Sequence, residues 1–319
     1  MKIRRRSSLA TLALALLCPN LLRADDDAPL NINLQFKTLG GKQFWTDIRV
    51  QGGWRIQQNH YTNHCRILDE RNVRQSWGSL NQCRQRFNRW VEDGTIRPYR
   101  RKIIILLHGV IRTRNSLAPL ADYLSDRQVA EVISWSYAST RQTISQHADK
   151  FAELLSHFPK EAEIYLVGHS MGNVVVRHFL KNQKDDRIKR MVMLAPPNQG
   201  SALGRAVDDN VLFESIWGVS GQELASGFKE LESRLETPKF EFGIIAGELK
   251  HNFVRNPLLD GPGDLVVSVE ETKLAGARDF RKVDSTHTRI MNQRQTLQYV
   301  HSFLKYGYFE SETTRKPLR

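Results

Sequence analysis

From about residue 102 onward, short apolar runs alternate with longer amphipathic stretches. The apolar runs have the length and β-branched content of buried strands: KIIILLHG, EVISWSY, EIYLVG, IKRMVMLAPP, FEFGIIAG and LVVSVEE. Between or after them lie stretches with helical spacing: SLAPLADYLSD, ISQHADKFAELLSHF, NVVVRHFLKN and TRIMNQRQTLQYVHSFLKY. This order predicts an α/β fold over residues 102–310, with a mostly parallel sheet and helices on both faces, followed by a tail at 311–319.

The preceding residues, 25–101, have a different pattern. Residues 25–30 indicate an acidic leader. The run FWTDIRVQGGWRIQQN alternates between apolar and polar positions and predicts a β-hairpin that turns at Gly52–Gly53. The run VRQSWGSLNQCRQRFNRWVEDG predicts a helix that ends at Gly94. Because this small, β-rich and mixed N-terminal extension cannot bury much core, we expect it to pack on the domain that follows.

Residues 1–24 have the layout of a secretory signal peptide. The positive segment KIRRR, residues 2–6, precedes the apolar stretch Leu9–Leu17 of about nine residues. That stretch is too short to span a bilayer, and Pro19 and Arg23 interrupt the alternative, a membrane anchor. Cleavage near residue 24 predicts an extracytoplasmic protein, either periplasmic or secreted.

Cleavage would leave two cysteines, Cys65 and Cys83. In an exported protein they most simply form one disulfide, which would close a loop of about 18 residues and stabilise by roughly 3 kcal/mol. Two buried free thiols are the alternative. No Cys-x-x-Cys or His-rich spacing suggests a metal site, so we expect neither a metal nor an organic cofactor.

The chain is basic, with a formal net charge of +13. Removing residues 1–24 takes away five cations and no anion and leaves +8. Between Arg55 and Lys102 lie eleven Lys or Arg and four Asp or Glu. No nucleic-acid-binding motif accompanies them, so the expected partner is an anionic membrane surface or an envelope polymer. A solvated basic face is the alternative.

The stretch LVGHSMGN, residues 166–173, joins a predicted strand to a predicted helix. Ser170 lies between them, two residues from Gly168 and two from Gly172, as in a G-x-S-x-G nucleophile elbow. The elbow holds the serine in a strained turn, where a side chain at either glycine would collide with the neighbouring strand or helix. The spacing predicts that Ser170 is a catalytic nucleophile.

A serine nucleophile needs a base that removes its proton. Behind an elbow of this kind, the order along the chain is serine, acid, histidine. His287, in VDSTHTRIM, lies in a polar loop before the last helix and is the expected base. His301 falls within that helix and His251 precedes the best acid, so both are weaker candidates.

The acid that orients the base is expected to be Asp264, in the Gly/Pro loop GPGDLVVSV. Asp260 is the alternative from the same loop. Asp284 lies only three residues before His287, too close for an acid delivered by a separate loop.

Attack on a carbonyl also needs two donors for the developing oxyanion. One of them is expected to be the backbone N–H of Met171, directly after the nucleophile. The other is expected at Val110 in LLHGVIRTRN, where Gly109 lets the backbone approach. His108 precedes the serine, so we interpret it as shaping this loop and not as the base.

Together, ILLHGVIRTRNSL, GHSMGN, LAPPNQGS, GDLVVSVEETKL and STHTRIM resemble the bacterial lipase and esterase families of the α/β-hydrolase fold. The resemblance covers roughly residues 102–308 and implies the α/β-hydrolase fold. In secreted lipases the acid lies in an Asp-Gly-x-Val-Ser-Val stretch, which supports Asp264, although Leu265 stands here in place of the glycine. A Pro-x-x-Gly-Ser turn such as PPNQGS leads in those lipases into a lid, which residues 201–237 would provide.

Two apolar clusters in residues 201–237 could form such a lid. QELASGFKELESRLE places Leu224, Phe228, Leu231 and Leu235 on one helical face, and residues 211–217 hold a second cluster: Val211, Leu212, Phe213, Ile216 and Trp217. The alternative is that these helices simply pack on the core.

These residues predict an exported serine ester hydrolase that acts through an acyl-enzyme on carboxylic esters, acyl lipids or similar amphiphiles. An acyltransferase, an amidase or a thioesterase would use the same residues, because only the acceptor or the leaving group differs. The alternative from another class is a non-catalytic module that binds envelope polymers or lipid.

Overall fold

The computed structural model describes residues 38, 40–127, 130–201, 211–225, 227–250, 256–257, 259 and 261–319, without the side chains of 211–216. The predicted signal peptide and acidic leader lie outside the described residues, as do His251 and Asp260.

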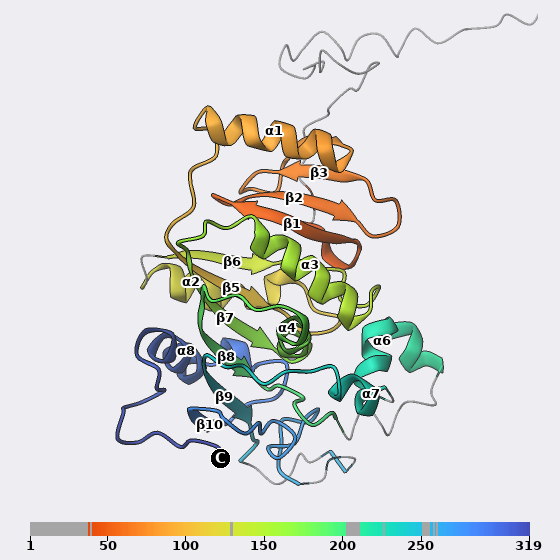
Figure 1. The fold of residues 1–319 in the computed structure, drawn as a ribbon. Coiled ribbons are helices and arrows are strands. Elements are labelled where there is room, and N and C mark those ends of the chain that lie inside the picture. Colours follow the sequence, from red (N-terminus) through yellow and green to blue (C-terminus); the bar gives the residue numbers. More distant parts are fainter. Residues whose placement is uncertain are drawn as a thin grey trace, which may run out of the picture.

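A six-stranded parallel sheet forms the larger part of the molecule (Figure 1). Its order is β10-β9-β8-β7-β5-β6, and every neighbouring pair is parallel. The strands are β5 (Lys102–Leu107), β6 (Glu131–Trp135), β7 (Glu163–His169), β8 (Ile188–Leu194), β9 (Glu241–Gly247) and β10 (Asp279–Val283). The predicted α/β class with a mostly parallel sheet is confirmed.

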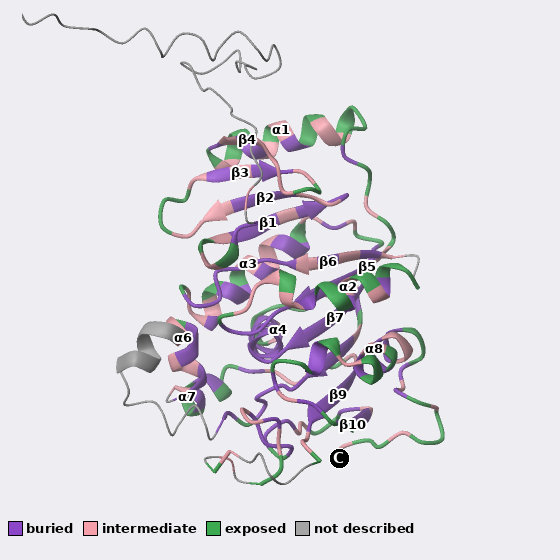
Figure 2. Cartoon of the chain, turned by 180° about the vertical axis from the view of Figure 1, so that it is seen from behind, coloured by how far each residue is buried: buried purple, intermediate pink, exposed green. Residues whose placement is uncertain are grey.

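Helices cover both faces of this sheet. The helices α3 (Ile144–Ser156) and α4 (Met171–Asn182) pack on one face, with Ile103 and Ile105 of β5. The helices α2 (Ala118–Ser125) and α8 (Arg294–Tyr306) pack on the other, with Ile104 and Leu106. Successive strand residues point to opposite faces, so a strand buried on both faces is apolar at every position. Figure 2 shows the central strands buried along nearly their whole length.

The N-terminal extension is a four-stranded antiparallel sheet covered by one helix. Its strands are β1 (Trp45–Gln51), β2 (Trp54–Asn59), β3 (Cys65–Leu68) and β4 (Arg74–Gly78), paired in chain order. The hairpin predicted across Gly52–Gly53 is confirmed. Residues 74–78, predicted as helix, are a strand. The helix α1 (Leu80–Glu92) begins only after Ser79, whose side chain accepts the N–H of Gln82 in a capping box.

The predicted disulfide is wrong. Cys65 and Cys83 are free thiols, both buried in the apolar cluster between α1 and the antiparallel sheet. Burial raises the pKa of Cys65 to about 11 and that of Cys83 to about 12. The thiolate needed for oxidation is therefore disfavoured, and both cysteines act as small apolar side chains.

Asp47 of β1 joins the two sheets. Its N–H donates to the carbonyl of Ser136 at 2.8 Å, and its carboxylate accepts the N–H of Ser136 at 2.9 Å. The same carboxylate accepts from Arg55 and Gln57, both at 2.7 Å, and is fully buried. A buried carboxylate is stable only when its oxygens are paired in this way, so Asp47 fixes the extension against the end of β6.

The segment LVVSVEE, predicted as a strand, is a series of turns. The carboxylate of Asp264 accepts the N–H groups of Val266 and Val267, and that of Glu271 accepts the N–H of Ser268. Side chains thus take the donors that a strand would offer to its neighbour. The sixth strand is instead β10, and residues 311–319 lie beside it, with Lys316 donating to Asp279.

The last helix is shorter than predicted. The 3-10 turn η3 (Ile290–Asn292) precedes α8, which begins at Arg294. Two further helices of the described residues, α6 (Val211–Leu224) and α7 (Phe228–Glu232), are separate where one continuous helix was predicted.

Candidate active site

Ser170 lies at the end of β7, between that strand and α4. Its φ of 52° and ψ of −123° place it in a backbone region that residues with a side chain seldom occupy. The N–H of Ser170 donates to the carbonyl of Leu194 on the neighbouring β8, which holds the turn against the sheet.

The two glycines of the elbow allow α4 to approach the sheet. A Cβ atom on Gly172 would lie 2.6 Å from the carbonyl oxygen of Leu107 at the end of β5. A Cβ atom on Gly168 would meet the side chain of Asn173 in α4. Both positions lack room for a side chain, so the glycines permit close backbone approach.

Asp264, His287 and Ser170 form a continuous chain of hydrogen bonds. His287 Nε2 lies 3.0 Å from Ser170 Oγ, and His287 Nδ1 lies 2.7 Å from Asp264 Oδ2. The carboxylate of Asp264 has no exposed area, and its Oδ1 accepts two backbone N–H groups. The structure therefore brings together the three residues expected to be nucleophile, base and acid.

The other acid and base candidates do not join this chain. Asp284 is exposed and accepts the N–H of Lys250 at 3.3 Å. His301 lies in α8, with its ring edge-on to Tyr123. His108 is fully buried, its Nδ1–H donates to the carbonyl of Gly109, and burial lowers its pKa to about 4.

Tyr137 supports the loop that contains His108. The ring of His108 stacks on that of Tyr137 at 4.1 Å, and the Tyr137 hydroxyl donates to the His108 carbonyl. Sequence reasoning missed Tyr137, whose only signal was its position as the last residue of the predicted strand EVISWSY.

His169 is a second residue that sequence reasoning missed. Its Nε2–H donates to the backbone carbonyl of His287 at 3.0 Å, which ties the loop of the base to the elbow. Burial, and then the nearby His287, lower the pKa of His169 well below its ordinary value, so its ring is neutral. Its place directly before the serine in GHSMG was the available signal.

The two expected oxyanion donors lie on either side of Ser170. Met171 is the first residue of α4, and its N–H has no acceptor within the helix. Val110 follows Gly109, on which a Cβ atom would lie 3.1 Å from Ser170 Cβ. Among the described residues, neither N–H donates to a backbone carbonyl. Ile111, next along this loop, has a φ of 61°, a strained value for a β-branched residue.

A narrow, mainly apolar cavity of about 40 Å³ opens at Ser170. Val110 borders it from the oxyanion loop, Val266 and Val267 from the loop of the acid, and Trp217 and Leu224 from α6. The walls suit an apolar group next to the nucleophile.

In the described part of the segment predicted as a lid, one of the two apolar clusters packs on the core. Leu224, Phe228, Leu231 and Leu235 are all buried in the core cluster that includes α3 and α4. Of the second cluster, only the side chain of Trp217 belongs to the described residues. Glu223 of α6 faces the start of α3, where its carboxylate accepts the N–H of Ile144 at 2.6 Å.

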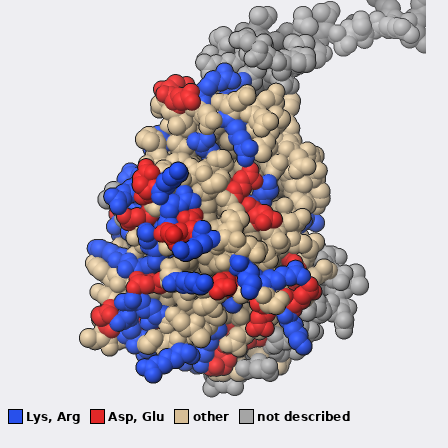
Figure 3. Space-filling model, in the orientation of Figure 1, with Lys and Arg blue, Asp and Glu red and all other residues tan. Residues whose placement is uncertain are grey.

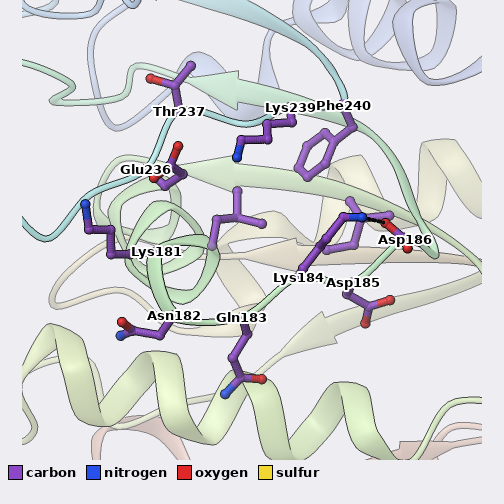
Figure 4. A pocket seen from close by; sticks show the side chains of 12 residues that line it. Lys181, Asn182, Gln183, Lys184, Asp185, Asp186, Glu236, Thr237, Lys239 and Phe240 are labelled. Atoms are coloured by element: carbon purple, nitrogen blue, oxygen red, sulfur yellow. Dashed lines mark ion pairs between the residues drawn. The ribbon is translucent and has the colours of Figure 1, made fainter.

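A larger cavity of about 530 Å³ lies away from these residues (Figure 4). It is bordered by the end of α4 and the segment after it, and across from them by residues 236–240. Leu180, one of its lining residues, is ten positions beyond Ser170, so this cavity lies about 15 Å along α4 from the nucleophile.

Within the described ranges, no group of three or more His, Cys, Asp or Glu is placed to hold a metal ion. None of the helices that the structure describes is both long and apolar enough to cross a membrane.

The parallel sheet, the strained serine between β7 and α4, and the acid and histidine on later loops define an α/β-hydrolase fold. The family described as lecithin:cholesterol acyltransferase matches residues 130–207, a segment that contains Ser170. No curated protein matches the chain.

Several solved structures have a similar backbone. The metagenomic carboxyl esterase MGS0156 shares 16% identity over 60% of this chain and 65% of its own, with a TM-score of 0.48. The lipase BlEst2 of Bacillus licheniformis, in mature form, shares 19% identity over 59% of this chain and 85% of its own, with a TM-score of 0.46. The lin2722 product of Listeria innocua shares 16% identity over 67% of this chain and 96% of its own, with a TM-score of 0.46.

Proposed function

We propose that this chain is a serine ester hydrolase that cleaves carboxylic esters, acyl lipids among them, through an acyl-enzyme. The observation that carries the proposal is the hydrogen-bonded chain from Asp264 through His287 to Ser170. A serine hydroxyl is a weak nucleophile unless an oriented base lies within hydrogen-bond distance, and this arrangement supplies one.

In the proposed reaction, His287 Nε2 takes the proton of Ser170 as Oγ attacks the ester carbonyl. The N–H groups of Val110 and Met171 donate to the oxygen that becomes negative. His287 then passes its proton to the departing alcohol, which leaves an ester between Ser170 and the acyl group. Asp264 holds the ring so that Nε2 faces the serine throughout.

Water completes the cycle: it takes the place of Ser170 as the attacking group, and Ser170 becomes the leaving group. His287 removes a proton from water, the resulting hydroxide attacks the acyl-enzyme, and the proton returns to Ser170 as the acid leaves. The apolar walls next to Ser170 support an acyl chain as the group held there.

The proposal is tested by hydrolysis of p-nitrophenyl esters from acetate to palmitate. Ser170→Ala is expected to lower kcat/KM by at least about a thousandfold, and Asp264→Asn by a similar order, because each removes a member of one catalytic unit. Ser156→Ala, an exposed serine at the end of α3, is the matched control and should retain parental activity. Equal activity of the parent and Ser170→Ala would refute the mechanism.

A second candidate is acyl transfer, favoured by the match of residues 130–207 to the lecithin:cholesterol acyltransferase family. An acyltransferase would pass the acyl group from Ser170 to an alcohol in place of water. Adding a lipid alcohol to the assay and separating the products distinguishes the two reactions. New ester at the expense of free acid indicates transfer, and unchanged free acid indicates hydrolysis.

The proposal includes export and contact with an anionic surface. Residues 1–24 have the charge and apolar pattern of a cleaved signal, and mass spectrometry of the N-terminus after expression with secretion machinery tests it.

The basic residues of 55–102 remain a proposed contact for membrane or envelope polymer. Several of them are paired, including Arg84 with Glu153 and Arg101 with Glu163. On the face shown in Figure 3, cations and anions are interspersed.

A further inference from the structure

Four exposed apolar side chains lie around the opening of the catalytic cavity. In the described part of the chain, five large apolar residues are at least 39% exposed: Phe44, Tyr61, Ile111, Val219 and Tyr306. Ile111 and Val219 belong to segments that border the cavity, whereas Phe44 and Tyr61 lie beside each other in the extension, which contacts the loop of Ile111 through Gln43. Clustered apolar exposure of this kind marks an interaction surface more often than scattered single residues do.

The N-terminal extension contributes two of the four. Phe44 ends the short turn η1 (Lys42–Phe44), and Tyr61 follows β2, with the two ring centroids 6.1 Å apart. Gln43 connects this pair to the catalytic domain. Its Nε2 donates to the carbonyl of Arg112 in the oxyanion loop at 2.8 Å, and its Oε1 accepts from Thr140.

The other two are close in sequence to residues that line the cavity. Ile111 follows Val110, which lines the cavity, and Val219 lies two residues after Trp217, which also lines it. Gly218 lies against the carbonyl of Thr140, where no Cβ atom would fit. Thr140 therefore contacts both α6 and Gln43 of η1, and Gln43 in turn contacts the oxyanion loop.

Figures 1 and 2 agree with this placement. The strand β1 begins and β2 ends on the side of the molecule where α6 lies, which is the side toward which the parallel strands point. An antiparallel sheet at the edge of the catalytic domain thus presents one of its ends beside the catalytic opening.

The short segments that carry or contact these side chains are basic. Segments 42–44, 60–64, 109–114, 137–143 and 217–222 contain no Asp or Glu. They contain Lys42 and Arg141, both exposed, and the partly exposed Arg112 and Arg114. The guanidinium of Arg141 lies over the Phe44 ring at 5.6 Å, so a cation and an aromatic ring share one position on the surface.

We propose that residues 42–44, 60–61, 111–112, 141 and 219, here called the mouth surface, bind an anionic phospholipid bilayer. Aromatic rings suit the level of the headgroups, and nearby cations attract anionic lipid, at about 1 kcal/mol per Lys or Arg. The bilayer would then face the opening at Ser170, so esters could reach the nucleophile without crossing water. This last step rests on the function proposed above, whereas the binding itself does not.

The test measures binding apart from catalysis. The full chain carrying Ser170→Ala is sedimented with sucrose-loaded vesicles of phosphatidylcholine containing about a third phosphatidylglycerol, and with vesicles of phosphatidylcholine alone. We expect stronger binding to the anionic vesicles, weakened by salt. The pair Phe44→Ser and Tyr61→Ser should lower partitioning about tenfold or more, and Arg141→Gln about fivefold.

Two variants serve as matched controls. Tyr306→Ser removes an aromatic ring of similar exposure at the end of α8. Tyr306 lies close to Arg190 near the start of β8, and so at the opposite end of the parallel strands from Ser170. Lys189→Gln removes an exposed cation at the start of β8, outside residues 55–102. Both should bind as the parent does.

Three results would overturn the proposal: unchanged binding in the Phe44→Ser, Tyr61→Ser variant, equal binding to uncharged vesicles, or sedimentation without any vesicles, which would indicate pairing with a second copy. Hydrolysis of a soluble short-chain ester by the parent, but not by Ser170→Ala, is measured separately. It shows whether a failure lies in the mouth surface or in the proposed function.

Discussion

Single residues at positive φ surround the catalytic chain. Ser170 has a φ of 52°, Ile111 of 61° and Leu265 of 82°, and each belongs to a loop that holds the proposed nucleophile, a proposed oxyanion donor or the proposed acid. Backbone strain of this kind persists only where the surrounding contacts compel it. At Leu265 the contacts are clear, because the carboxylate of Asp264 accepts the N–H groups of the next two residues.

Leu265 provides a test of that strain. Glycine adopts a φ of 82° without the steric cost that a Cβ atom imposes, a cost of about 1 kcal/mol. Leu265→Gly is therefore expected to be more stable than Leu265→Ala by about 1 kcal/mol, since both variants lack the leucine side chain. Urea unfolding of the two proteins measures the difference. An alanine variant as stable as the glycine variant would show that the turn carries no strain.

At the scale of elements, polar contacts fix α6 against α3. Ser220 Oγ lies 3.2 Å from His147 Nε2 and donates to the carbonyl of Gln142 at 2.5 Å. Glu223 accepts the N–H of Ile144 in the first turn of α3, where the helix dipole favours a negative charge. Burial raises the pKa of that carboxyl above its ordinary value. Because α6 borders the catalytic cavity, these contacts help to define its wall.

His147 makes this junction sensitive to pH. Burial, and then His108, lower the pKa of His147 to about 3, whereas in the unfolded chain it is near 6.5. Between these values the unfolded chain binds a proton that the folded chain does not. Stability is therefore complete above pH 6.5 and falls as the pH is lowered, by about 2 kcal/mol at pH 5.

The measurement is the free energy of unfolding at pH 7 and pH 5. His147→Gln is expected to lose about 2 kcal/mol less than the parent over this interval. Ser220→Ala keeps the histidine and should retain the parental pH dependence. If His147→Gln and the parent respond equally to pH, His147 does not stay neutral in the folded protein.

At the scale of the whole molecule, a buried charged junction joins the extension to the α/β domain. Asp47 pairs with Arg55 and with the backbone of Ser136, and Trp135 Nε1 donates to the Asp47 carbonyl at 2.9 Å. Through this junction the antiparallel sheet holds η1 beside the oxyanion loop. The extension is thus part of the surroundings of the catalytic opening.

Removing the Asp47 carboxylate should destabilise both parts together. Asp47→Ala leaves Arg55 buried without its partner and is expected to lower the free energy of unfolding by about 3 kcal/mol. Glu92→Ala, an exposed acid at the end of α1, is the control and should change little. Tryptophan fluorescence and circular dichroism should report a single transition in both variants. Two separate transitions would mean that the extension unfolds independently.

Much of the architecture could be predicted from local patterns. Apolar runs such as KIIILL identified the strands because a strand buried on both faces has no polar position. The run around Gly52–Gly53 identified the hairpin because alternation of apolar and polar residues is typical of strands with one buried face. The elbow motif placed Ser170 between a strand and a helix, because its glycines are required by local backbone crowding.

Predictions failed where side chains compete with backbone partners. Ser79 begins α1 through its own hydroxyl, so the preceding residues were free to form β4. In the segment LVVSVEE, the carboxylates of Asp264 and Glu271 take the donors of a run that is strand-like by composition. Such competition depends on orientation, which composition does not encode.

By itself, then, the sequence determined the parallel sheet, the hairpin and the position of the serine, because each follows from spacing within about ten residues. Tertiary structure alone decided that Asp264 reaches His287, that Cys65 and Cys83 remain thiols, and that Gln43 of the extension contacts the loop after β5. These outcomes depend on contacts between segments far apart in the chain, whose distances only the folded chain determines.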